Sequence, residues 1–110
     1  MTSFKLSVNQ RITETDGHIR AKISLSKNYF MEFSEYVQLS RGGAIKIETY
    51  SYHCFDASGN LIIRWDNTPH FPDLPGFPHH VHTGSSEKPQ PCKPMDLYKS
   101  LSEIKKLIEG

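Results

Sequence analysis

Residues 44–66 read AIKIETYSYHCFDASGNLIIRWD, and this stretch decides the fold. Two segments rich in apolar and β-branched residues flank a run of turn-forming residues, Asp-Ala-Ser-Gly-Asn, at 56–60. This order predicts two antiparallel strands joined as a hairpin, because side chains alternate with a period of two along a strand. The two faces of the first strand would carry Tyr50, Tyr52 and Cys54 on one side and Ile45, Ile47, Thr49, Ser51 and His53 on the other.

The chain before this hairpin predicts three more strands. Residues 4–14, 18–25 and 29–36 alternate apolar and polar side chains, as a half-buried strand does. Turn-forming pairs separate the successive strands, namely Asp16-Gly17, Lys27-Asn28 and Gly42-Gly43. We therefore expect an antiparallel sheet of about five strands, with residues 4–14 as an exposed edge that another chain could extend.

The C-terminal residues predict one helix. A stripe of apolar residues recurs there at three- and four-residue spacing, formed by Leu97, Leu101, Ile104, Leu107 and Ile108. Asp96 precedes the stripe and can cap the helix. A chain of 110 residues has room for one core, so we predict a single α+β domain over residues 1–110 with the helix packed on one face of the sheet.

All seven prolines lie between the hairpin and this helix, in residues 67–94. Proline fixes φ and lacks a backbone N–H, so we expect neither a helix nor a central strand in this segment. Residues 67–82 also contain two phenylalanines and four histidines, and we expect them to pack over the hairpin as a long Pro/His-rich loop. Residues 83–94 are polar and predict a flexible linker to the helix.

Composition narrows the class of protein. Thirteen Lys and Arg against twelve Asp and Glu give a net charge of +1, so any nucleic-acid contact would depend on a local basic patch. The sequence has no long apolar run and no signal-peptide pattern, and we expect a cytoplasmic protein without a membrane partner. Cys54 and Cys92 lack a nearby cysteine, which predicts two reduced thiols, with Cys54 in the core.

Five of the six histidines lie in residues 53–82, together with Arg64 and Asp66. Cleavage of RNA by attack of the 2′ hydroxyl requires a base, an acid and a cation for the phosphate, and imidazole and guanidinium suit these roles. The geometry of a hairpin about residues 56–60 would put His53 opposite Leu61 to Ile63, one or two places from Arg64. The candidate catalytic residues are His53, Arg64, Asp66, His70, His79 and His80, and the candidate substrate-binding residues are Tyr52, Trp65, Asn67 and His82.

The expected roles follow from the chemistry of each group. Arg64 would hold the phosphate, and Asp66 would orient an imidazole, as a carboxylate commonly does for a catalytic histidine. His53 would share the two proton transfers with one further histidine, taken from His70, His79 and His80.

Other interpretations of the same residues stay open. His80-x-His82 with His70 or Asp66 could ligate Zn²⁺, which would support a metal-dependent phosphodiesterase instead. The aromatic residues Tyr52 and Trp65 could simply pack in the core, and the histidines of the loop could bond to the backbone. The chain would then be a non-enzymatic partner-binding domain. We expect no metal and no other cofactor.

Residues 50–82 also form a recognisable motif. It reads Tyr-Ser-Tyr-His-x-x-Asp-x-x-Gly-x-Leu-Ile-x-Arg-x-Asp-Asn-x-Pro-His at 50–70, followed by Phe-Pro-His-His-x-His at 77–82. The motif resembles the TumE family, small toxins of prokaryotic toxin–antitoxin systems. The resemblance is weaker in residues 18–37, and the C-terminal helix matches the family only in kind.

This resemblance implies a toxin made beside an antitoxin, often one with a helix-turn-helix domain. Many small bacterial toxins of similar sheet-plus-helix build are ribonucleases, so ribonuclease activity is implied by analogy. The resemblance supplies no catalytic residues, and the candidate site is the one reasoned from the residues above. We therefore predict a metal-independent endoribonuclease whose partners are an antitoxin and RNA, with a second copy of the chain as a further candidate partner.

Overall fold

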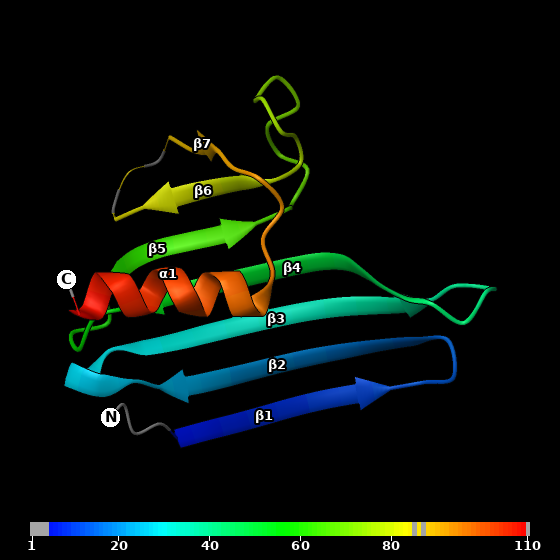
Figure 1. The fold of residues 1–110 in the computed structure, drawn as a ribbon, viewed down its shortest axis with the longest axis horizontal. Coiled ribbons are helices and arrows are strands. Elements are labelled where there is room, and N and C mark those ends of the chain that lie inside the picture. Colours follow the sequence, from blue (N-terminus) through cyan, green and yellow to red (C-terminus); the bar gives the residue numbers. More distant parts are fainter. Residues whose placement is uncertain (1–4, 85, 87, 110) are drawn as a thin grey trace.

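The computed structural model describes residues 5–84, 86 and 88–109, and over these residues it contains one antiparallel sheet and one α-helix (Figure 1). The strands follow one another in space in chain order, from β1 to β7, so each strand pairs with the next along the chain. The predicted α+β class is confirmed. The elements are β1 Lys5–Ile12, β2 Asp16–Ser24, the 3-10 turn η1 Ser26–Asn28, β3 Phe30–Leu39, β4 Ile45–Phe55, β5 Leu61–Asp66, β6 His80–Thr83, β7 Gln90–Pro91 and α1 Leu97–Glu109.

The strand count is seven over the described residues, so the predicted count of about five was wrong. The two additional strands, β6 and β7, lie inside the segment 67–94, for which the prolines predicted neither a helix nor a central strand. β6 contains no proline and can therefore pair fully with β5. Pro91 lies in β7, which is the edge strand of the sheet. Proline is tolerated there because, among the described residues, no further strand needs a hydrogen bond from its backbone nitrogen. Residues 85 and 87, within the predicted linker, lie outside the described residues.

Two local predictions are corrected. The β1–β2 turn consists of residues 13–15 rather than Asp16-Gly17, because Asp16 is already the first residue of β2. Thr13 Oγ1 donates to Asp16 Oδ1 at 2.6 Å and closes this turn. The β4–β5 register also differs, since His53 pairs directly with Arg64 rather than with a residue at 61–63. A bulge causes the shift, because Phe55 pairs with Leu61 and Cys54 with Ile63, which leaves one residue of β5 unpaired.

The core lies between α1 and one face of the sheet. Its buried side chains come from the middle strands and the helix, namely Met31, Tyr50, Tyr52, Cys54, Trp65, Ile104 and Ile108. The predicted face of β4 that carries Tyr50, Tyr52 and Cys54 is the buried one, as alternation requires. Both cysteines are free, and burial raises the pKa of Cys54 to about 11, so its thiol stays protonated at neutral pH.

The helix begins as its sequence predicts. Asp96 Oδ1 accepts the Lys99 backbone N–H at 2.7 Å, which is an N-cap. Ile104 and Ile108 face the sheet, whereas Leu107 is 51% exposed. Leu107 therefore lies outside the stripe that packs on the sheet, since a step of three residues from Ile104 turns it away from the sheet by about 60°. At the other end, Lys27 Nζ donates to the Ile108 carbonyl oxygen at 2.9 Å and ties η1 to the helix. No helix in the described part of the chain is long and apolar enough to cross a membrane.

Candidate functional site

The position of each candidate residue depends on the face of the sheet that it occupies. Residues paired across antiparallel strands point to the same face, so the register defines rows of neighbouring side chains. One face packs under α1, and we call it the helix face. The opposite, open face carries two adjacent rows, Lys22–Glu32–His53–Arg64–His82 and Arg20–Ser34–Ser51–Asp66–His80.

The open face brings together five of the ten predicted site residues, namely His53, Arg64, Asp66, His80 and His82. Tyr52 and Trp65, the predicted substrate-binding aromatics, lie on the helix face and are 0% and 4% exposed. Their surroundings are those of core residues. His79 precedes β6 and also faces the helix side, where its ring stacks on Tyr50. His79 and His80 therefore point to opposite faces of the sheet.

The other two predicted residues lie at the ends of the strands. Asn67 accepts the Tyr50 backbone N–H at 2.9 Å and donates to the Glu48 carbonyl oxygen at 3.0 Å. It therefore holds β4 to the end of β5, which is a structural role. His70 is exposed in the loop between β5 and β6, and its ring meets the edge of Phe71. Neither side chain joins the group on the open face.

His53 stands at the centre of the open face, half-buried between β3 and β5. Its Nε2 forms a short hydrogen bond with Ser51 Oγ. Burial lowers the pKa of His53 below its ordinary value of 6.5, and the positive charge of Arg64 lowers it further, against smaller opposing effects of Asp66 and Glu32. His53 is therefore neutral at pH 7. If its Nε2–H donates to Ser51, the lone pair of Nδ1 is left to accept a proton.

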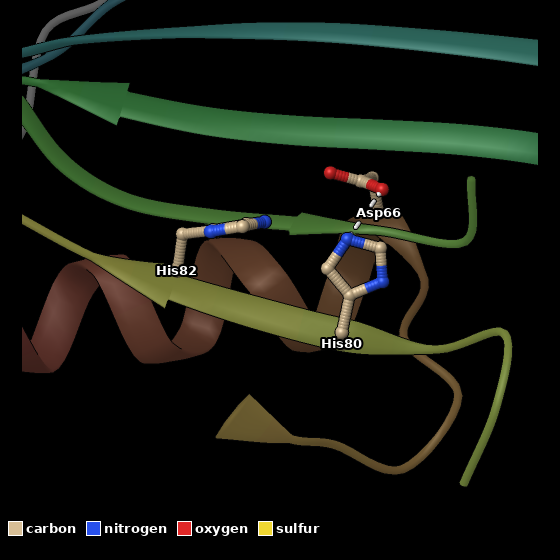
Figure 2. Close-up of side chains that lie close together, drawn as sticks. All are labelled: Asp66, His80 and His82. Carbon is tan, nitrogen blue, oxygen red and sulfur yellow. Dashed lines mark ion pairs between the residues drawn. The ribbon is translucent and has the colours of Figure 1, made fainter. Parts of the chain in front are cut away.

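Asp66 connects Arg64 with His80. Asp66 Oδ1 lies 2.9 Å from His80 Nε2, and Asp66 Oδ2 lies 3.1 Å from Arg64 Nε. The Arg64 contact is an ion pair without hydrogen-bond geometry, because Nε has no hydrogen-bond partner among the described residues. On its other side, His80 Nδ1 lies 3.0 Å from the Pro78 carbonyl oxygen. Both ring nitrogens of His80 thus lie next to oxygen atoms, and Figure 2 shows the contact with Asp66.

His82 completes the group and is buried with it. Asp66, His80 and His82 are 5%, 2% and 7% exposed, so solvent scarcely reaches them. The ring of Phe71, from the loop after β5, covers both histidines with its centroid 5.1 Å from that of His80 and 6.1 Å from that of His82. His82 Nε2 is buried without a hydrogen-bond partner in the part of the chain that the structure describes. Beside these three buried residues, the side chain of Arg64 is 36% exposed, so solvent reaches it.

Two aromatic residues that the sequence analysis missed lie on the open face beside His53. Phe30 and Phe55 stack with their ring centroids 4.9 Å apart, and the Phe55 ring lies 5.9 Å from that of His53. Lys22 Nζ lies 4.4 Å above the Phe30 ring. Alternation along β4 places residue 55 on the same face as residue 53, so the period-two pattern could have identified Phe55.

A groove of about 550 Å³ runs from His53 toward β1 over the open face. Two cationic side chains, Arg20 and Lys22, line it together with the anionic Glu32. The groove contains His53 but not Arg64, Asp66, His80 or His82. The open face thus offers an accessible cationic surface that ends at His53 and Arg64, next to a buried Asp66–His80–His82 cluster.

Comparison with known proteins identifies the family. No curated protein and no solved structure gives a significant match to the chain. The model of the family described as toxin TumE matches residues 1–110, which is the whole chain. The chain therefore belongs to the TumE family, the toxin components of toxin–antitoxin systems, and an antitoxin is its general partner.

Proposed function

We propose that this toxin cleaves RNA on the open face of its sheet, with His53 and Arg64 as the residues that contact the reacting phosphate. The observation that carries the proposal is the direct cross-strand pairing of a neutral imidazole with an arginine beside an aromatic stack. Guanidinium binds phosphate through its planar fork, and a neutral imidazole can accept a proton near pH 7. The stacked rings of Phe30 and Phe55 offer a surface for a nucleobase.

The reaction needs two proton transfers, and His53 can make the first. The 2′ oxygen attacks phosphorus while its proton passes to His53, and the bond to the 5′ oxygen, on the opposite side of phosphorus, breaks as that oxygen takes a proton from solvent water. Protonated His53 then returns its proton to solvent. The products are a 2′,3′-cyclic phosphate and a 5′ hydroxyl. Arg64 stabilises the negative charge that develops on the phosphorus oxygens.

This assignment changes the expected role of His80. His80 shares the open face with His53, but it is 2% exposed beneath Phe71 and cannot reach a substrate in this conformation. A series of contacts runs from the Pro78 carbonyl oxygen to His80, from His80 to Asp66, and from Asp66 to Arg64. We therefore assign Asp66 and His80 to positioning Arg64.

The test is an RNA cleavage assay on purified protein with chelator present. His53→Ala should reduce the cleavage rate by about 10²- to 10⁴-fold, the usual contribution of general acid–base catalysis. Arg64→Lys keeps the charge but loses the fork, so it should also reduce cleavage. His79→Ala is the matched control, because His79 faces the helix side, and it should keep cleavage if the variant is folded.

The ends of the products provide a second check, since the mechanism requires a 2′,3′-cyclic phosphate. Cleavage that survives His53→Ala within about threefold would overturn the assignment of His53. Loss of cleavage in His79→Ala, with its fold intact by circular dichroism, would move the site to the other face. Cleavage only in the absence of chelator would favour the metal-dependent phosphodiesterase instead.

Binding of the antitoxin is a second role, and exposed apolar side chains favour a place for it. Three of these side chains, on β1, β3 and β4, line one hollow: Ile12 at 67%, Leu39 at 47% and Ile45 at 74% exposed. These residues belong to the end of the sheet that α1 does not reach (Figure 1). We propose that the antitoxin covers this surface. Ile12→Ser with Ile45→Ser should prevent co-purification with the antitoxin while RNA cleavage continues. Unchanged co-purification would place the antitoxin elsewhere.

A further inference from the structure

We propose that Asp66, His80 and His82 form a binding site for one divalent transition-metal ion of the Zn²⁺ type. One carboxylate oxygen and one ring nitrogen of each histidine lie within 4.8 Å of one another. Neutral imidazole and carboxylate are common ligands of such ions, and three protein ligands leave a coordination position for water or another group. The inference does not depend on RNA cleavage.

The backbone explains why these three side chains converge. His80 and His82 are two residues apart on β6, so both point to the open face. Asp66 on β5 pairs directly with His80 and therefore points to the same side. Figure 2 shows Asp66 and His80 facing each other, with the ring of His82 turned toward the pair from farther along β6.

A second and independent observation points to a ligand. His82 Nε2 is buried and makes no hydrogen bond to any of the described residues. A buried polar atom without a partner costs free energy, about 1–3 kcal/mol for a typical group. Coordination of an ion would satisfy such a nitrogen, and the 7% exposure of His82 leaves solvent little room to do so.

The surroundings of the ligands match those of metal sites. A metal-bound histidine usually donates its other N–H to a carbonyl or carboxylate, and His80 Nδ1 lies 3.0 Å from the Pro78 carbonyl oxygen. That hydrogen bond directs His80 Nε2 toward Asp66. Asp66 Oδ1 also accepts the Thr68 backbone N–H at 3.0 Å, which holds the carboxylate in place.

The distances require only a small adjustment. Ligand atoms on a tetrahedral ion with bonds of about 2.1 Å are about 3.4 Å apart. His80 Nε2 and Asp66 Oδ1 are 2.9 Å apart, so this pair would open by a few tenths of an ångström. The widest pair, within 4.8 Å, would close. The ion would replace the direct contact between Asp66 Oδ1 and His80 Nε2.

Arg64 is the group that opposes a cation at this site, because its Nε lies 3.1 Å from Asp66 Oδ2. However, Arg64 approaches one carboxylate oxygen and His80 the other. The Arg64 side chain is also 36% exposed, so it can turn toward solvent. Replacing Arg64 by alanine should therefore leave metal affinity intact or raise it, while RNA cleavage is lost. This variant separates the metal site from the proposed catalytic function.

The experiment uses the full chain, treated with chelator and desalted, and titrated with Zn²⁺ alone by calorimetry and with Co²⁺ alone by visible absorption. We expect one ion per chain. His82→Gln should weaken binding by more than about 100-fold, because even groups that only orient a ligand contribute 10- to 100-fold. His70→Ala and His79→Ala are matched controls that remove neighbouring histidines and should leave the affinity unchanged.

A measurement on the unmodified protein covers the case in which His82→Gln fails to fold. Zn²⁺ should shift the ring ¹⁵N signals of His80 and His82 and leave those of His18 and His70 in place. Absence of binding would overturn the proposal. Shifts confined to His18 or His70, or affinity unchanged in folded His82→Gln, would show adventitious surface binding and would overturn it equally.

Discussion

His79 and His80 are adjacent in the chain, yet they belong to opposite faces of the sheet. His79 Nδ1 lies 2.6 Å from the Tyr50 hydroxyl, which also accepts the Met95 backbone N–H at 3.3 Å. His80 instead lies between the Pro78 carbonyl oxygen and Asp66. Burial lowers the pKa of His79, so its neutral ring suits the hydrogen bond from Tyr50. Two neighbouring histidines thus serve packing on the helix face and polar chemistry on the open face.

The two faces are also held together by different forces. The helix face is stabilised by apolar burial around Tyr52, Met31 and Ile104, each at most 1% exposed. The open face contains charged and polar groups whose burial is tolerated because they pair with one another, as Asp66 does with His80. A change on the helix face should therefore alter stability first, and a change on the open face should alter activity or binding first.

The largest expected effect on stability is that of Tyr52→Ala on the helix face. The ring is fully buried, and its hydroxyl donates to Glu35 Oε2 at 2.6 Å. Removal of a buried aromatic side chain typically costs 3–5 kcal/mol, so we expect a loss of about 4 kcal/mol in the free energy of unfolding, measured with urea. Tyr52→Phe keeps the packing and should lose about 1 kcal/mol. A loss below 1 kcal/mol in Tyr52→Ala would contradict the core assignment.

Asp66→Asn on the open face should have the next largest effect. The substitution removes the negative charge that holds His80 and Arg64, and hydrogen bonds to charged groups contribute about 1.5–3 kcal/mol. We expect a loss of about 2 kcal/mol in urea denaturation. Ser51→Ala is a control on the neighbouring strand that leaves the Asp66 contacts in place. Equal stability of Asp66→Asn and the unmodified protein would show that the negative charge of Asp66 does not stabilise the fold.

The pH dependence of stability should have opposite signs at acid pH, where buried histidines titrate, and at alkaline pH, where the buried tyrosines of the helix face titrate. The pKa of His53 is lower in the folded than in the unfolded chain, so the unfolded chain binds more protons and stability falls as the pH drops below about 6.5. Burial raises the pKa of Tyr50 and of Tyr52, with the Glu35 hydrogen bond adding to the rise for Tyr52. The unfolded chain then releases protons first, and stability falls above about pH 10.

Urea denaturation between pH 5.5 and 7.5 tests the acid side. Arg64, Asp66 and Glu32 face His53, and their charges contribute to its pKa shift. His53→Gln removes the imidazole and should reduce the slope, with the remainder due to His79 and His82, whose pKa values burial also lowers. Identical slopes for His53→Gln and the unmodified protein would assign the acid sensitivity to other groups.

The smallest effect is expected for His70→Ala. His70 is exposed and contacts only the edge of Phe71 among the aromatic rings described. Exposed substitutions of this kind usually change the free energy of unfolding by no more than about 0.5 kcal/mol. RNA cleavage should also stay within about twofold. A strong loss of cleavage in folded His70→Ala would bring the loop after β5 back into the site.

Much of the fold could be predicted from the sequence, because its signals are local. Alternation with a period of two identified the first five strands, and it placed Tyr50, Tyr52 and Cys54 on the buried face of β4. The spacing of apolar residues and the capping position of Asp96 located the helix. The motif at 50–82 indicated the TumE family, which the match over residues 1–110 confirms. Each of these signals depends on residues close together in the chain.

The candidate site could not be predicted from the sequence, because the pairing between strands determines which side chains lie next to one another. The bulge in β5 set Arg64 opposite His53, and a bulge cannot be identified from an apolar run such as 61–63. β6 gained its strand conformation from pairing with β5, since four residues beside prolines carry little strand signal of their own. This pairing places the side chains of His80 and His82 on the open face and that of His79 on the helix face. The sequence by itself determined which groups were present, and the register between strands determined which of them meet.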